Sequence, residues 1–97
     1  MEDIVYYNDL YDLYGDLLTT KQQEYFKDYY FDNLSYSEMA SKYDVSRNAV
    51  FKQLHIVLKK LDEYEEKLKL YDKKNRINRI LSKVDDSEVR ELLENLF

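Results

Sequence analysis

The chain of 97 residues has no cysteine, no proline and no tryptophan, and it contains one glycine and one histidine. Without cysteine there can be no disulfide and no thiolate metal ligand, and His55 alone cannot build a zinc site. Proline is absent and Gly15 is the single glycine, so almost nothing in the sequence would interrupt a helix. We therefore predict a single all-α domain over residues 1–97.

Long hydrophobic runs are also absent, because no apolar stretch approaches the roughly 20 residues that span a membrane. The first ten residues are acidic where a secretory signal is basic, so we expect a cytoplasmic protein. The chain has 20 acidic and 15 basic residues, a net charge of -5. Residues 1–34 carry -6 and residues 61–97 carry -2, whereas residues 35–60 carry +3. We expect residues 35–60 to be the one locally basic part of the protein. The electrostatic field of the whole molecule would not attract DNA.

That basic segment has the layout of a helix-turn-helix at about residues 35–60. Apolar residues at helical spacing predict two earlier helices, over about 3–18 and from Thr19, which forms a capping box with Gln22, to about Phe31. Ser35 and Glu38 repeat the capping-box spacing and predict a short helix that ends near Lys42. Asp44 can take the left-handed conformation of the turn, Val45 is expected to fill the core, and Ser46 caps a helix that begins at Arg47.

No stop signal follows Arg47, so we predict one long helix over residues 47–83 and a C-terminal helix over residues 86–97, with Asp85 and Glu88 at capping-box spacing. Apolar residues at alternating three- and four-residue steps form a heptad seam on the long helix. This seam must pack against the first two helices or against a second copy of the chain. We predict a homodimer with Leu61, Tyr64, Leu68, Tyr71, Leu93, Leu96 and Phe97 at its interface.

The second helix of a helix-turn-helix places its first turns in the major groove of DNA. Arg47 can pair with guanine or a phosphate and Asn48 with adenine, while serines and Lys42 near the helix ends can touch phosphates. Phe51 is unusual there, because its apolar ring suits either a thymine methyl group or a protein partner. The candidate DNA contacts are Ser35, Ser37, Lys42, Ser46, Arg47, Asn48, Phe51, Lys52, His55 and Lys59. The alternative is an ordinary solvated surface of a helical bundle.

Enzymatic residues are not recognisable in this sequence. There is no glycine-rich phosphate loop, and His55 has no identifiable nucleophile or orienting partner. The aspartates of the first helix alternate with apolar residues, which favours a solvated face over a metal site. We predict no enzymatic activity, no metal and no cofactor.

The stretch from Leu17 to Leu61 resembles region 4 of bacterial sigma factors, through "LT..Q", "S..E.A" and "VS..AV". It departs from that pattern at Phe51 and Ile56, where sigma-type sequences tend to be basic. "LTTKQQEYFKDYYFDNLSYSEMA", "VSRNAVFKQL" and "LDEYEEKLKLY" together resemble the YlxM family of small bacterial helix-turn-helix proteins. The second resemblance runs from about Tyr6 to Arg79.

These resemblances imply a sigma region-4-like fold and a regulatory DNA-binding function. Genes of the YlxM family commonly lie beside those of the signal recognition particle GTPase and its receptor. The resemblance therefore implies a role in that pathway, with either protein as a partner. The alternative function is a protein- or ribonucleoprotein-binding module that keeps the fold without binding DNA.

Overall fold

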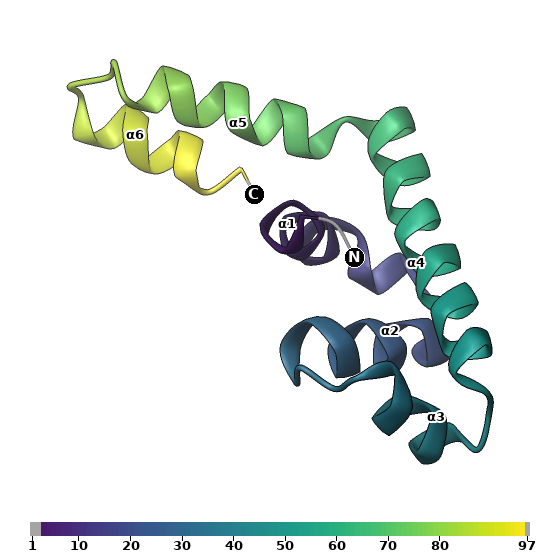
Figure 1. Ribbon diagram of the computed structural model, residues 1–97. Coiled ribbons are helices and arrows are strands. Elements are labelled where there is room, and N and C mark those ends of the chain that lie inside the picture. Colours follow the sequence, from purple (N-terminus) through teal and green to yellow (C-terminus); the bar gives the residue numbers. More distant parts are fainter. Residues whose placement is uncertain (1–2, 97) are drawn as a thin grey trace.

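The computed structural model describes residues 3–96, which form six α-helices, two short segments of other helix types and no strand. The predicted all-α class is confirmed. The molecule is elongated, with extents of 54, 25 and 22 Å, because α5 leaves the end of α4 at a steep angle (Figure 1). In chain order the elements are α1 (Ile4–Tyr14), the 3-10 helix η1 (Gly15–Leu17), α2 (Thr20–Phe26), the π-helix η2 (Lys27–Phe31), α3 (Tyr36–Tyr43), α4 (Arg47–Leu68), α5 (Leu70–Leu81) and α6 (Ser87–Glu94).

Two apolar clusters hold α1 to α4 together, and α4 contributes to both. The first cluster joins α1, the end of α2 and the later turns of α4, and its buried members are Leu10, Tyr14, Leu18, Phe26, Val57, Leu58 and Leu61. The second cluster joins α2, α3 and the first turns of α4, with Tyr25, Met39, Ala40, Val50 and Leu54 buried. One apolar stripe on α4 therefore fixes the helix-turn-helix at one end and α1 further along.

The predicted capping boxes at the starts of α2 and α3 are confirmed. The Thr19 hydroxyl accepts from the Gln22 amide at 3.1 Å, and the Gln22 side chain accepts from the Thr19 amide at 3.0 Å. Ser35 and Glu38 make the same reciprocal pair, with both distances 3.0 Å. Local sequence therefore sets where these two helices begin.

The single helix predicted over residues 47–83 is wrong, because the chain breaks between α4 and α5. Lys69 takes left-handed backbone angles, with φ 56° and ψ 30°, and its amide still donates to the Glu65 carbonyl at 2.8 Å. Neither glycine nor proline marks the break, so the usual sequence signals of a helix end are missing.

Side chains from α4 and α1 cap the start of α5. The Glu65 carboxylate accepts from the amides of Tyr71 at 2.9 Å and Asp72 at 3.2 Å. The Tyr14 hydroxyl of α1 donates to Glu65 at 2.6 Å and accepts from the Leu70 amide at 3.0 Å. These bonds satisfy amides that every helix leaves without partners in its first turn, so they stabilise a new helix at this point.

Three residues of the predicted dimer seam pack inside the chain. Leu61 is 0% exposed in the first apolar cluster, so its prediction as an interface residue is wrong. Tyr64 packs beside Tyr14, with 5.9 Å between ring centroids, and Tyr71 meets Tyr6 edge to face at 5.2 Å. These three residues of the seam therefore pack within the same chain and not against a second copy.

The other predicted interface residues lie at the surface or outside the described range. Leu68 is 45% exposed and Leu96 is 62% exposed, while Leu93 is half-buried. Phe97 lies outside the described residues. The homodimer itself stays a prediction.

The C-terminal helix packs against α5 as a hairpin. Asp86 rather than Asp85 caps α6, because its carboxylate accepts from the amides of Glu88 and Val89, at 2.9 and 3.1 Å. The predicted capping box at this helix start is therefore wrong, and α6 begins at Ser87. Arg90 holds the hairpin closed by donating to two carbonyls at the end of α5, those of Leu81 at 2.8 Å and Val84 at 3.2 Å.

Candidate nucleic-acid interface

The turn between α3 and α4 has the geometry that a helix-turn-helix requires. Asp44 is left-handed, with φ 52° and ψ 51°, as predicted, and the Val45 amide reaches back to the Ala40 carbonyl at 3.0 Å. This bond satisfies an end carbonyl of α3 in the manner of a Schellman motif. Ser46 then caps α4 by accepting from the Ala49 amide at 3.0 Å. Val45 itself is 41% exposed, so its predicted place in the core is wrong, since it lies on the connection between the helices.

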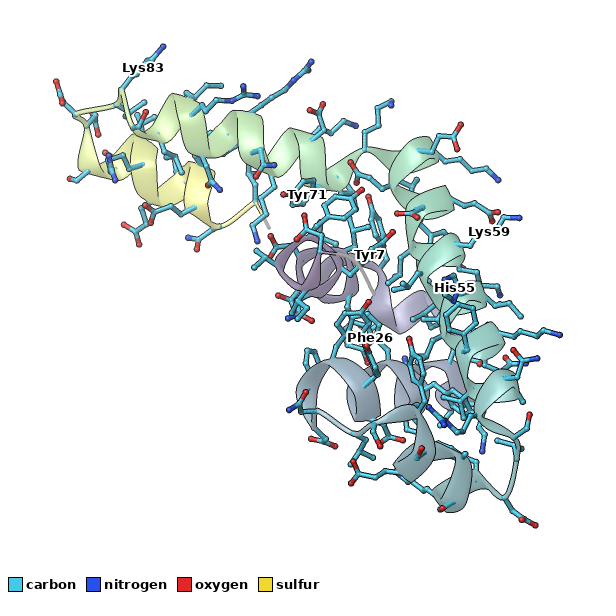
Figure 2. The ribbon with its side chains drawn as sticks, in the orientation of Figure 1. Tyr7, Phe26, His55, Lys59, Tyr71 and Lys83 are labelled. Carbon is cyan, nitrogen blue, oxygen red and sulfur yellow. The ribbon has the colours of Figure 1, made fainter. Side chains whose placement is uncertain are left out.

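The first turns of α4 present a basic and polar face to solvent. Val50, Leu54 and Val57 point into the core, as predicted. The candidate contacts on the other side are all exposed, namely Arg47, Asn48, Phe51, Lys52, His55 and Lys59. In Figure 2, Lys59 points away from the core of the molecule.

The charge of this face changes sign along α4. After Lys59 this face of α4 becomes acidic, with exposed Asp62, Glu63 and Glu66 in the next two turns. A polyanion is therefore attracted to the first half of the helix and repelled by the second half. The segment from residue 47 to residue 59 is about 18 Å long at 1.5 Å per residue, which limits where DNA could lie on α4.

Three predicted contacts gather around one hollow of about 440 Å³. Ser35, Ser37 and Arg47 line it, together with Tyr29 and Tyr36. The hollow thus joins the N-terminal turns of α3 and α4, where the helix dipoles favour an anion. The sequence did not indicate the two tyrosines, whose approach depends on how η2 packs against α3.

Lys42 forms an ion pair with a buried carboxylate. Its ammonium group lies 2.9 and 3.1 Å from the two oxygens of Asp28, which is 4% exposed. The Tyr43 hydroxyl donates to the same carboxylate. Burial and this hydrogen bond raise the pKa of Tyr43, and the hydrogen bond to Asp28 raises the pKa of Lys42. Lys42 is thus already paired with a carboxylate, although its side chain is 49% exposed, and its contact with a phosphate stays a prediction.

Phe51 is 42% exposed and belongs to a small aromatic group on the interface. Its ring meets Tyr36 of α3 edge to face at 5.9 Å and lies 4.1 Å from the His55 ring, between centroids. The His55 Nδ1 atom is 3.0 Å from the Phe51 carbonyl oxygen. Helical spacing explains the second pair, whereas the contact with Tyr36 required the tertiary structure.

Residues 3–96 contain neither a membrane-spanning helix nor a cluster of metal ligands. No helix there is long and apolar enough to cross a membrane. No three histidine, aspartate or glutamate side chains of this range gather closely enough to hold a metal ion.

A family profile matches residues 1–96, and its description reads "Putative helix-turn-helix protein, YlxM / p13 like". The chain belongs to this family, UPF0122. The resemblance to the YlxM family is therefore confirmed. The description names a helix-turn-helix protein and no enzyme.

Bacterial members of UPF0122 align with most of the chain. A UPF0122 protein of Ureaplasma urealyticum serovar 10 is 41% identical over 87 residues, which cover 90% of this chain and 88% of that protein. A UPF0122 protein of Bacillus cereus strain AH187 is 44% identical over 77 residues, covering 79% and 70%. The UPF0122 protein of Shouchella clausii strain KSM-K16 is 48% identical over 66 residues, covering 68% and 61%.

Proposed function

We propose that this protein is a non-enzymatic regulator that binds duplex DNA through α3 and the first half of α4. The observation that carries the proposal is the hollow lined by Ser35, Ser37 and Arg47. Hydroxyl groups, a guanidinium group and two helix N-termini meet there, which is the chemistry that holds a phosphate. The hollow lies beside the exposed polar face of α4, where base edges could be read.

The residues of the interface divide by role. Arg47 lies in the hollow, so we assign it to a phosphate and not to guanine. Asn48 is the next residue and is exposed, and its amide matches the paired donor and acceptor of adenine. Lys52 and Lys59 continue the basic face and would contact phosphates on either side of the groove.

Salt-dependent binding tests the proposal. Fluorescence anisotropy with a mixed-sequence duplex should show binding at about 50 mM salt that weakens about 40-fold at about 200 mM. That ratio is expected for three phosphate contacts, from Arg47, Lys52 and Lys59, at a slope of about 0.9 per contact. Arg47→Ala should weaken binding to all sequences and lower the slope by about 0.9, while Lys27→Gln on η2 is the matched control.

Sequence preference is tested separately at Asn48. After selection of a preferred site, Asn48→Ala should reduce discrimination at one A·T pair by about 1–3 kcal/mol and leave the salt slope unchanged. Absence of any binding by the wild-type protein at about 50 mM salt would overturn the proposed function.

The second candidate function is a protein- or ribonucleoprotein-binding module, which the exposed ring of Phe51 favours. An apolar ring beside Tyr36 and His55 is a suitable anchor for a protein surface. Phe51→Ala would then abolish capture of the signal recognition particle GTPase by the purified protein, with Ile56→Ala as the control. Loss of capture without any DNA binding by the wild type would favour this candidate.

The proposal extends to pathway, location and assembly. The resemblance to the YlxM family supports regulation of the signal recognition particle pathway in the cytoplasm, through the GTPase or its receptor. We also propose a homodimer through Leu68, Leu93 and Leu96, the predicted interface residues that do not pack inside the chain. A monomeric mass in analytical ultracentrifugation at tens of micromolar would exclude that dimer.

A further inference from the structure

The segment of residues 69–83 is more basic than the helix-turn-helix. It contains six bases and one acid, a net charge of +5 against +3 for residues 35–60. Acidic residues flank the segment on both sides, so residues 61–97 as a whole carry a net charge of -2. The basic segment is therefore not evident from that sum. The expectation of one locally basic segment is therefore wrong. The bases are Lys69, Lys73, Lys74, Arg76, Arg79 and Lys83.

Four of these bases form a stripe along α5. Lys73 and Arg76 are three residues apart on one face of the helix, while Lys69 immediately precedes α5 and Lys83 follows it in the turn before α6. All four are exposed, whereas Leu81 of α5 is buried. In Figure 2, Lys83 points away from α1 and α6, and α6 lies on the other side of α5.

Polar donors border this stripe. A hollow of about 530 Å³ runs along α5 and is lined by Asn75, Arg79 and Ser82, among others. The acid on its rim, Asp72, lies 3.4 Å from Arg76 in an exposed ion pair. Such a pair is weak, so it does not prevent Arg76 from turning to a stronger anion.

The stripe is separate from the DNA interface of α3 and α4. The stretch of α4 from Lys59, the last base of the first interface, to Lys69 lies between the two surfaces, a distance of about 15 Å along the helix axis. Exposed Glu63 and Glu66 stand on this intervening length, and α5 then turns away at a steep angle (Figure 1). A duplex that lies along α4 would have to pass these acids before it reached α5.

We propose that the outer face of α5 is a second binding surface for duplex DNA. The 12 residues of α5 span about 18 Å, and the same length of duplex carries about ten phosphate charges. The single aromatic residue of α5, Tyr71, packs against Tyr6, so the face offers no ring on which unpaired bases could stack. Ile80 is the single exposed apolar residue in the stripe, too little surface for insertion into a membrane.

This surface gives the protein two DNA contacts that face different directions. One copy can hold a duplex on the recognition helix and a second segment on α5, which would bring two parts of a chromosome together. The second contact does not depend on the first, because no residue of α3 or the first half of α4 belongs to it.

Site-specific crosslinking tests the location of the DNA. The chain has no cysteine, so Ile80→Cys and Asn48→Cys each carry a single benzophenone label, on the α5 face and on the recognition helix. Asp12→Cys, on the acidic exposed side of α1, is the control. A labelled duplex should crosslink at positions 80 and 48 but not at 12. The crosslink at position 80 should persist when Arg47→Ala and Lys52→Ala are added.

The outcomes separate this proposal from the proposed function. Crosslinking at position 48 alone overturns the second surface and supports the first. Crosslinking at position 80 alone supports the second surface and overturns the first. Absence of both crosslinks overturns both proposals.

Charge reversal supplies an independent test of the same surface. Lys73→Glu with Arg76→Glu is compared with Lys27→Glu plus Lys60→Glu, which changes the net charge equally at residues outside both surfaces. Both pairs are made in a protein that already carries Arg47→Ala and Lys52→Ala. Lys73→Glu with Arg76→Glu should abolish the remaining duplex binding at about 50 mM salt, whereas the control substitutions should leave most of it. Equal losses of duplex binding in the two pairs would overturn the proposal. Binding of duplex RNA or phosphatidylserine vesicles to the α5 face, without binding of duplex DNA, would also overturn it.

Discussion

Replacement of Tyr14 by phenylalanine isolates the cap that bends the chain between α4 and α5. Tyr14 is 0% exposed, and its hydroxyl joins α1 to Glu65 of α4 and to the Leu70 amide of α5. The variant keeps the buried ring in the first apolar cluster and removes only the oxygen. It therefore leaves packing intact while the Leu70 amide and one Glu65 oxygen lose a partner.

The expected cost follows from these two bonds. Loss of a bond to a charged acceptor is worth about 1.5–3 kcal/mol, and a donor left without a partner costs about 1–3 kcal/mol. Glu65 retains the amides of Tyr71 and Asp72, so we expect a net loss of about 2 kcal/mol in the free energy of unfolding. In a domain of this size that loss lowers Tm by about 8–16 °C.

Urea denaturation followed by circular dichroism measures this difference. Tyr11→Phe is the matched control, because Tyr11 lies on the same helix with its ring stacked on Phe26 at 4.4 Å, and its hydroxyl has no hydrogen bond within residues 3–96. The control should change stability by less than about 0.5 kcal/mol. If Tyr14→Phe is as stable as Tyr11→Phe, the hydroxyl does not hold the bend and the explanation is refuted.

Three further predictions concern stability. Lys69→Gly should stabilise the protein by about 0.5–1 kcal/mol in thermal unfolding, because glycine takes the left-handed angles without steric cost; a destabilised variant would contradict this account of the break. Asp28→Asn should cost about 1–2 kcal/mol through its buried partners, whereas exposed Asp32→Asn should cost almost nothing, as urea midpoints would show. Burial and a carboxylate partner raise the pKa of Tyr14 to about 12 and also raise that of Tyr43. The folded state then holds these protons more tightly than the unfolded state, whose tyrosine pKa is near 10, so stability should be complete below pH 10 and fall toward pH 12. A tyrosinate absorbance titration with all tyrosines at their ordinary pKa would contradict it.

Residues that act within one turn of helix were predictable from sequence. Thr19 with Gln22, Ser35 with Glu38 and the Ser46 cap depend on partners three residues away, and all three are present. The alternation of buried and exposed positions on α4 was predictable for the same reason, because helix geometry fixes which residues share a face.

Residues whose partners lie far away in the chain were not predictable. Lys42 was expected at a phosphate, but its partner Asp28 is 14 residues earlier and approaches only through the packing of η2 against α3. Leu61 was expected at a dimer interface, because a heptad pattern indicates that a helix face is buried but not whether the same chain or a second copy covers it. Within the chain that surface is α1.

Composition, caps and helical periodicity by themselves determined an all-α helix-turn-helix with a polar exposed face on α4, because these signals act over a few residues. The tertiary structure decided the bend at Lys69, the hollow that joins Ser35, Ser37 and Arg47, and the separation of a second basic face on α5. The bend depends on a hydroxyl of α1, at Tyr14, more than 50 positions away from the amide that it caps. Contacts between residues so far apart in the sequence form only when the helices pack, so no local sequence pattern could have predicted them.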